Sequence, residues 1–238
     1  SFNGVVGRDW AFSGGNPSTS QGSDPAVFYY TPGTYDVSLT VNDGNSNMSN
    51  TKTQFITVLS SIGHDLPFEE GFEDITSLPS NDWFTYDPQE DGTFGITSNA
   101  AYTGAQSVKL SNSSNDAGKI DELTSSTINL KFFQDATITF KYAYRRRNND
   151  NDDRLRFYVS NDCGESWSLR KQFRGQTNLP SGNDVAGSWS PNGPGDWNEA
   201  VIDNIQSSYF EEGFRFKFWF ESDGGNNLYI DDININST

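Results

Sequence analysis

The chain has 238 residues, which is enough for one large β domain or for two smaller ones. Hydrophobic residues make up only 33% and aromatic residues 14%, with 22 glycines and 9 prolines, a balance that favours short strands and polar loops over packed helices. The formal net charge of −16 argues against a nucleic-acid partner, and no apolar run approaches the roughly 20 residues of a membrane span.

The first 58 residues are typical of short β-strands separated by turns. The clearest strand covers residues 34–41, where apolar and polar side chains alternate strictly, as they do in a strand with one face on a core. A turn at Pro32 and Gly33 precedes it, because proline presets φ and glycine permits a positive φ. Further strands are predicted at residues 10–12, 27–30 and 55–58.

Aromatic, glycine and proline residues in this segment follow a characteristic order. They are Trp10, Phe12, Gly14-Gly15, Pro17, Ser20, Pro25, Tyr30, residues 32–41 and residues 56–58. In this order they resemble a PKD-type immunoglobulin-like domain, which implies a β-sandwich over residues 1–60. Only nine residues precede Trp10, so we expect the domain to be partial. Family members often bind cations just after this tryptophan, but Ala11 stands there, so we expect no metal ion at that position.

Residues 61–66 lack periodicity and form a predicted linker, after which the pattern changes. Further strands with one apolar face are predicted at residues 138–142, 154–160 and 214–220. In the last of these, phenylalanine occupies every second position, while Arg215, Lys217 and Trp219 point the other way. We therefore expect residues 67–238 to form a jelly-roll β-sandwich with a phenylalanine-rich core, and the whole chain to be all-β.

Two adjacent aspartates, Asp231 and Asp232, lie in the middle of an alternating strand near the end of the chain. Ionised carboxylates in a half-buried strand cost free energy unless a cation or hydrogen-bond donors meet them. The first and last strands of a jelly roll commonly lie close together, so we expect Glu73 to approach Asp231. Carboxylate and carbonyl oxygens suit Ca²⁺, and we predict a structural calcium ion at Glu73, Asp231 and Asp232. The alternative is that loop amides or water meet these carboxylates.

Several motifs of the larger segment also occur in a characteristic order. They are residues 70–73, residues 121–123, the Asp-Cys-Gly-Glu-Ser-Trp of residues 162–167, residues 196–197 and the Asn-Asn-Leu-Tyr-Ile-Asp-Asp of residues 226–232. They resemble MAM-like jelly-roll domains and, more closely, domains that follow PKD modules in secreted proteins of Bacteroidetes. The resemblance implies a non-catalytic accessory or adhesion-type region, secreted or at the cell surface, that contacts proteins or glycans. It also implies type IX secretion and a parent protein with other domains, among them a cytophagalysin- or pappalysin-type zinc metallopeptidase.

The loop at residues 175–199 carries Trp189 and Trp197 among glycine, proline, serine and asparagine. Exposed aromatic rings on a β-sandwich often stack on sugar rings, so both tryptophans are candidate ligand-binding residues. This favours an alternative function, a carbohydrate-binding module of a secreted glycan-degrading enzyme. The other interpretation is that the two tryptophans pack the loop onto the sandwich.

Side chains for common catalytic schemes are scarce. The chain has one cysteine, Cys163, and one histidine, His64, so an internal disulfide and a two-histidine zinc-protease motif are excluded. His64 lies in the predicted linker, which makes it a poor base for Cys163. Nothing in the spacing of aspartate and glutamate selects a glycosidase pair, so we expect no enzyme within this chain. Asp150, Asp152 and Asp153 leave a second calcium site open.

Overall fold

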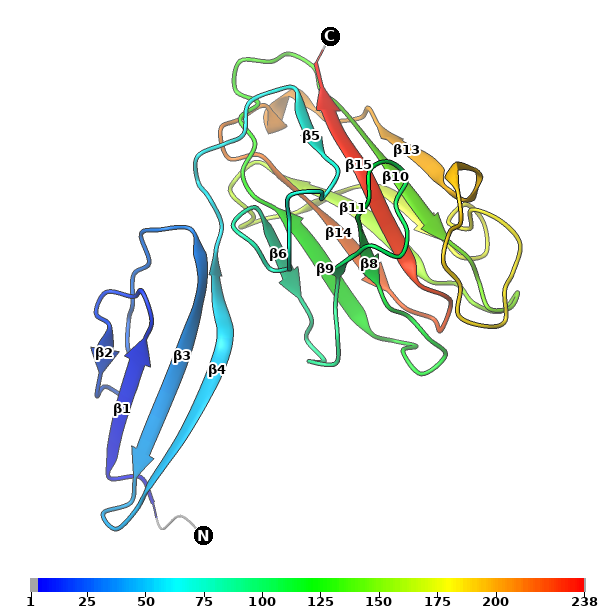
Figure 1. Ribbon diagram of the computed structural model, residues 1–238. Helices are drawn as coiled ribbons and strands as arrows, with labels where there is room; N and C mark the ends of the chain where they lie inside the picture. The colour runs from blue at the N-terminus through cyan, green and yellow to red at the C-terminus, as the bar shows by residue number, and fades with distance from the viewer. Residues whose placement is uncertain (1–3, 238) are drawn as a thin grey trace. The chain divides into compact units, whose positions relative to one another are not determined.

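The computed structural model describes residues 4–237, and its regular secondary structure consists almost entirely of β-strands (Figure 1). Its backbone divides into two compact units. The smaller unit holds the described residues up to Ser60 together with Pro79–Asn81, and the larger unit holds Ser61–Leu78 and the residues from Asp82 onward. Within residues 4–237, no helix is long and apolar enough to cross a membrane.

The smaller unit contains one antiparallel sheet with the strand order β2-β1-β3-β4 (Figure 1). Its strands are β1 (Gly7–Phe12), β2 (Thr19–Ser20), β3 (Gly33–Asn42) and β4 (Asn47–Val58). Trp10 lies opposite Leu39 in the ladder between β1 and β3, and Phe12 lies opposite Val37. The apolar residues that alternate along β3 therefore lie on the same face of the sheet as the aromatic residues of β1, as expected for a strand with one face on a core.

The strand predicted at residues 27–30 is wrong, because only Phe28 forms a bridge, with Asn16. Within this segment Tyr29 packs against Tyr35, with 4.7 Å between ring centroids, while Phe28 and Tyr30 are exposed. The alternating pattern of the sequence thus arises because one ring points inward and the two rings beside it point outward. Among the residues that the structure describes, no neighbouring strand adds further hydrogen bonds to the single bridge at Phe28.

The larger unit is a sandwich of two antiparallel sheets. The first sheet has the order β13-β10-β15-β8-β7, and β5 pairs with β15 alongside β8. Its strands are β5 (Phe68–Glu70), β7 (Gly95–Thr97), β8 (Ser107–Leu110), β10 (Thr137–Tyr144), β13 (Asn198–Ile202) and β15 (Leu228–Asn236). Glu70 lies opposite Ile233, so the first and last strands of this unit are neighbours, as the sequence predicted.

The second sheet has five strands in the order β12-β11-β14-β9-β6. They are β6 (Trp83–Tyr86), β9 (Ile120–Ser125), β11 (Arg154–Ser160), β12 (Ser168–Arg174) and β14 (Arg215–Glu221). Buried and partly exposed residues alternate along β11 and β14, which are the two central strands. One face of this sheet therefore covers the core and the other faces outward.

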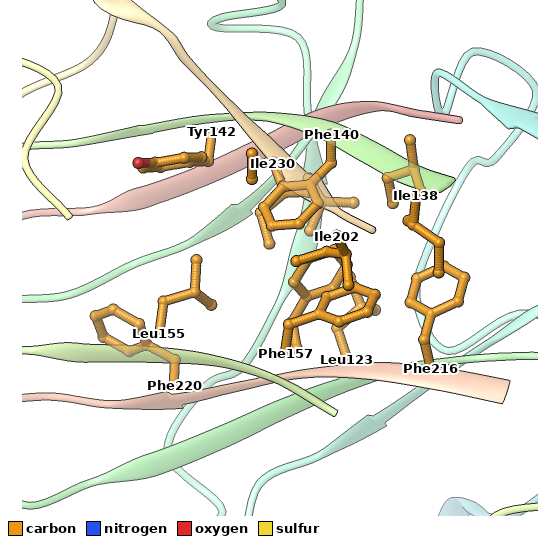
Figure 2. Packing of buried hydrophobic residues seen from close by; sticks show 14 of the residues in the cluster. Leu123, Ile138, Phe140, Tyr142, Leu155, Phe157, Ile202, Phe216, Phe220 and Ile230 are labelled. Atoms are coloured by element: carbon orange, nitrogen blue, oxygen red, sulfur yellow. The ribbon is translucent and has the colours of Figure 1, made fainter. Parts of the chain in front are cut away.

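The core between the two sheets consists largely of phenylalanine (Figure 2). Figure 2 shows Phe140 of β10 pointing toward the side chain of Phe157 on the opposite sheet, and Phe216 pointing toward Ile138. The ring centroids of Phe140 and Phe218 are 4.9 Å apart in an edge-to-face arrangement, and those of Phe157 and Phe218 are 5.3 Å apart. Such aromatic pairs add about 0.5–1.5 kcal/mol each to the free energy gained from burial alone. The predicted phenylalanine core is confirmed.

A tight turn joins β11 to β12 at the Asp-Cys-Gly-Glu-Ser-Trp motif. Cys163 and Gly164 have positive φ values of 58° and 92°, which reverse the chain. The carboxylate of Asp162 accepts hydrogen bonds from the hydroxyls of Ser160 and Ser166, which lower its pKa to about 2. The motif therefore has the turn role that its sequence favours.

Candidate functional site

The three carboxylates predicted to bind calcium all meet one loop, the β7–β8 loop of residues 98–106. Glu73 lies in the turn after β5, and its Oε1 accepts hydrogen bonds from the backbone N–H groups of Ala105 and Gln106, both at 2.9 Å. The side chain of Gln106 returns a bond to the carbonyl oxygen of Glu73, also at 2.9 Å. The turn after β5 is thus fastened to the loop from both sides.

The two aspartates of β15 reach the same loop. Asp231 Oδ2 accepts a hydrogen bond from the backbone N–H of Tyr102 at 2.6 Å, and Asp232 Oδ1 accepts one from the hydroxyl of Thr103 at 2.6 Å. These bonds join residues that lie 129 positions apart in the sequence. Backbone amides and a hydroxyl of this loop thus meet the three carboxylates, as the alternative interpretation of the sequence expected, and nothing in the sequence pointed to this loop.

A bulge in β15 explains how two consecutive aspartates can reach one loop. Asp232 has a φ of +46°, and the ladder between β10 and β15 shifts register between Thr139 and Lys141. A bulge residue breaks the strict alternation of side chains, so Asp231 and its neighbour both turn toward the loop. The turn before Glu73 is also fixed, because Glu70 Oε1 accepts the backbone N–H of Phe72 at 2.6 Å.

Asp231 is fully buried, and burial raises the pKa of its carboxyl to about 6. Lys141 lies opposite Asp231 in the ladder, but its ammonium group pairs with Glu199 at 2.5 Å. Among residues 4–237 no lysine or arginine forms an ion pair with Asp231. The local groups that meet this carboxylate are therefore backbone amides, including that of Asp232 at 2.8 Å.

The chemistry of these donors suits a hard cation. Carboxylate, hydroxyl and backbone carbonyl oxygens are the ligands of Ca²⁺, which takes six to eight of them, and the nitrogen and sulfur ligands of zinc do not occur here. In the described part of the chain, however, no three His, Cys, Asp or Glu side chains are close enough to form a metal site by themselves. A calcium ion at Glu73, Asp231 and Asp232 would need carbonyl oxygens of the β7–β8 loop to complete its shell.

The two candidate sugar-binding tryptophans pack against the outward face of the first sheet. Trp197 is 8% exposed, and its ring centroid lies 6.3 Å from that of Tyr229. Trp189 is partly exposed, lies 6.3 Å from Tyr229 and is covered by the guanidinium group of Arg145 at 4.8 Å. Both side chains hold their loop onto the sandwich, and a stacking role stays a prediction for the partly exposed edge of Trp189.

The candidates for a second calcium site, Asp150, Asp152 and Asp153, have different surroundings. Asp152 pairs with Arg174, which lowers its pKa, whereas Asp153 is buried and accepts a hydrogen bond from the Tyr144 hydroxyl at 2.7 Å. Asp150 is exposed at the hairpin tip. This segment therefore anchors strands and loops and does not gather oxygen ligands around one point.

His64 and Cys163 have separate surroundings. His64 Nε2 lies 3.0 Å from Asp82 Oδ1, and its ring contacts the edge of Phe68. Cys163 lies in the exposed turn after β11, where its backbone N–H donates to the carbonyl of Gly213 at 3.0 Å. His64 and Cys163 thus have different neighbours in the described part of the chain.

A second buried carboxylate, outside the candidate calcium site, is that of Asp121 of β9, which is 7% exposed. Burial raises its pKa to about 6 from 3.8, and the nearby carboxylates of Asp87, Asp91 and Asp116 add to the rise. Between about pH 4 and 6 the folded protein therefore holds a proton that the unfolded chain has released. The stability contributed by protonated Asp121 is complete below about pH 4 and is lost as the pH rises through 6.

Asp121→Asn should remove this pH dependence, because an amide stays neutral throughout. As the pH rises from 4 to 7, the unfolding free energy of the variant should increase relative to that of the wild type by on the order of 2–3 kcal/mol. Urea denaturation at several pH values measures this difference. Asp162→Asn is the control. The pKa of Asp162 is lowered to about 2, so the difference in unfolding free energy between this variant and the wild type should stay constant in this range. A constant difference for Asp121→Asn would contradict the prediction.

Known proteins share parts of this architecture. Residues 3–58 match the PKD domain family. The match covers most of the smaller unit and confirms the resemblance expected there. Among curated proteins, none matches the chain.

Solved structures match most of the chain. The K2 cleaved adhesin domain of Lys-gingipain aligns with a TM-score of 0.52 and 17% identity, over 73% of this chain and 99% of that domain. The K3 cleaved adhesin domain of Lys-gingipain from Porphyromonas gingivalis W83 aligns with a TM-score of 0.52 and 15% identity, over 71% of this chain and 98% of that domain. A structure of carbohydrate-binding modules from the β-sandwich superfamily aligns at 0.48 and 19% identity, over 98% and 86%. The two adhesin domains establish a shared fold.

Proposed function

We propose that this chain is a non-catalytic, adhesion-type binding region of a secreted multidomain bacterial protein. The observation that carries the proposal is the fold that over 70% of the chain shares with two adhesin domains of Lys-gingipain, over nearly their full length. Its partners are proteins or glycans outside the cell or at its surface.

The motifs at residues 162–167 and 226–232 support a more specific parent protein. They resemble domains that follow PKD modules in proteins exported by type IX secretion, and a PKD match precedes them here. We place the chain beside a zinc metallopeptidase domain, whose substrate or host surface it would hold.

Calcium is part of the proposal. Glu73, Asp231 and Asp232 would bind one ion together with carbonyl oxygens of the β7–β8 loop. The attachment of carboxylates from both ends of the unit to one loop supports this, as does the burial of Asp231 without a cationic side chain. The ion would fasten β15, the turn after β5 and the loop to one another, so it would stabilise the fold and carry out no reaction.

A carbohydrate-binding module of a glycan-degrading enzyme is the second candidate. Partly exposed aromatic residues on the outward face of the second sheet, Tyr158 and Trp219, favour it. The two candidates differ in the activity of the parent protein, and both assign this chain a binding role.

Binding and catalysis can be tested with the purified chain. Labelled protein titrated in millimolar Ca²⁺ onto a glycan array and onto fixed epithelial cells should show saturable binding to at least one of them. The same protein should release no peptides from casein and no reducing sugar from polysaccharides. Hydrolysis that remains with the pure chain, or the absence of saturable binding on both supports, would overturn the proposed function.

A further inference from the structure

The two sheets of the larger unit differ in what covers their outward faces. The outward face of the first sheet is covered by the β7–β8 loop and by Trp189 and Trp197. On the second sheet, the outward residues of β11 and β14 are all partly exposed apart from Ser160, which is buried. The partly exposed residues include Arg154, Arg156, Tyr158, Arg215, Lys217 and Trp219, which we call the cationic face.

Cations and aromatic rings alternate across the cationic face. Arg156 lies opposite Trp219 in the ladder, and Tyr158 lies opposite Lys217. The guanidinium group of Arg156 is 4.3 Å from the Trp219 ring centroid, and Lys217 Nζ lies 5.7 Å from Tyr158 and 4.7 Å from Trp167. These contacts hold the long cationic side chains in place, so less rotamer entropy remains to be lost when a ligand binds.

Positive charge exceeds negative charge on this face. Its cations are Arg154, Arg156, Arg215 and Lys217, with Arg174 beside them on β12, opposite Arg154. Its carboxylates are those of Glu122, Glu221 and Asp152, and each is already paired with one or two of these cations.

Arg215 differs from the other cations of the face. Its Nε donates to the hydroxyl of Thr127 at 3.1 Å, and within residues 4–237 it forms no ion pair with a carboxylate. The whole chain carries a net charge of −16, so an anion approaching it is repelled on average. A local excess of cations is therefore the place where an anionic partner would be attracted.

We propose that the cationic face binds an anionic polysaccharide whose sugar rings carry carboxylate or sulfate groups. Guanidinium forks bind such groups with paired hydrogen bonds, and the edges of Tyr158 and Trp219 offer apolar surface to the rings. A sheet face with aromatic residues on adjacent strands fits ring-shaped units better than an acidic peptide, which would use the charges alone. This names a ligand class for the adhesion role proposed above, and it rests on that role.

Affinity electrophoresis and calorimetry of the full chain test the proposal. Polygalacturonate supplies carboxylates and dextran sulfate supplies sulfates, while neutral dextran and poly-glutamate are the reference polymers. We expect binding to at least one anionic polysaccharide, weakened by salt, with no binding to dextran and at least tenfold weaker binding to poly-glutamate. Which of the two polymers binds identifies the anionic group.

Matched variants locate the site. Arg154→Gln combined with Arg156→Gln, and separately Trp219→Ala, should weaken binding at least tenfold. Lys131→Gln and Phe132→Ala remove a cation and an exposed aromatic ring from the segment between β9 and β10 and should leave the affinity unchanged. Trp189→Ala tests the other candidate stacking residue. Thermal unfolding of each variant checks folding, and the arginine variants decide the matter should Trp219→Ala fail to fold.

Several outcomes would overturn the proposal. They are the absence of binding to both anionic polysaccharides, equal binding to poly-glutamate, which favours an acidic protein partner, and loss of binding in Trp189→Ala with none in the arginine variants. Saturable binding to cells or to neutral glycans that survives the arginine substitutions would reject the cationic face and leave the adhesion role intact.

Discussion

Replacing Phe218 by alanine should lower the unfolding free energy of the larger unit by about 3–5 kcal/mol. The side chain is fully buried, and its ring lies 4.9 Å from Phe140, 5.3 Å from Phe157 and 5.9 Å from Phe216, measured between centroids. Alanine would leave a cavity among rings held by two opposing sheets, which cannot close in without shifting a ladder. Urea denaturation followed by tryptophan fluorescence measures the loss as a lower midpoint at an unchanged slope.

Leu169→Ala is the control for this prediction. Leu169 lies on β12 of the same sheet but is 47% exposed, so its truncation should cost less than about 1 kcal/mol. A loss below about 1 kcal/mol for Phe218→Ala would show that the space between the sheets is loosely packed and would contradict the arrangement of the core.

Removing calcium should lower the unfolding midpoint of the larger unit by about 5–10 °C. An ion present at 100 times its dissociation constant stabilises the folded state by about 2.7 kcal/mol, and each kcal/mol shifts the midpoint of a unit of this size by about 2–4 °C. Without the ion, the carboxylates that approach the β7–β8 loop would be met by amides and a hydroxyl alone. Thermal unfolding in excess chelator and in millimolar Ca²⁺ measures the shift.

Two variants make this test specific. Asp231→Asn should unfold at nearly the same temperature with and without the ion, because the amide gives up the charge that attracts it. Asp150→Asn changes an exposed carboxylate at the hairpin tip and should keep the full calcium shift. An equal shift in wild type and Asp231→Asn would show that calcium acts elsewhere, and no shift in either would argue against a stabilising ion.

Strands were predicted well where burial alternates over many residues. β11 was expected at residues 154–160 and has these bounds, because arginine and tyrosine alternate there with leucine, phenylalanine and valine on a central strand. β3 extends only one residue beyond the expected segment at each end. The failure at residues 27–30 has a physical reason, since alternation reports which side chains point inward but not whether a neighbouring strand supplies hydrogen bonds.

The candidate site was predictable in part. The first and last strands of the larger unit were expected to be neighbours, and β5 and β15 are paired. The β7–β8 loop was missed because its contribution comes mostly from backbone N–H groups, which leave no mark in the side-chain sequence. The bulge at Asp232 was missed as well, because a positive φ at an aspartate depends on the register of the neighbouring strand.

For the outward residues of β14, the sequence predicted the direction of the side chains but not their contacts. Their direction was predicted from the phenylalanine repeat, but their role depends on neighbours that lie far away in the sequence. Lys217 meets Glu122 from β9 and Trp167 from the turn before β12, and neither contact has a signature in local spacing. The charge of the face emerges only when the strand order is known.

The most direct test of the central claim, that carboxylates from both ends of the larger unit hold a calcium ion, is a calorimetric titration of Ca²⁺ into the chelator-treated chain. We expect one saturable site in this unit that is lost in Asp231→Asn and weakened at least tenfold in Glu73→Gln. A titration without binding heat at several temperatures, or a site of unchanged affinity in both variants, would contradict the claim.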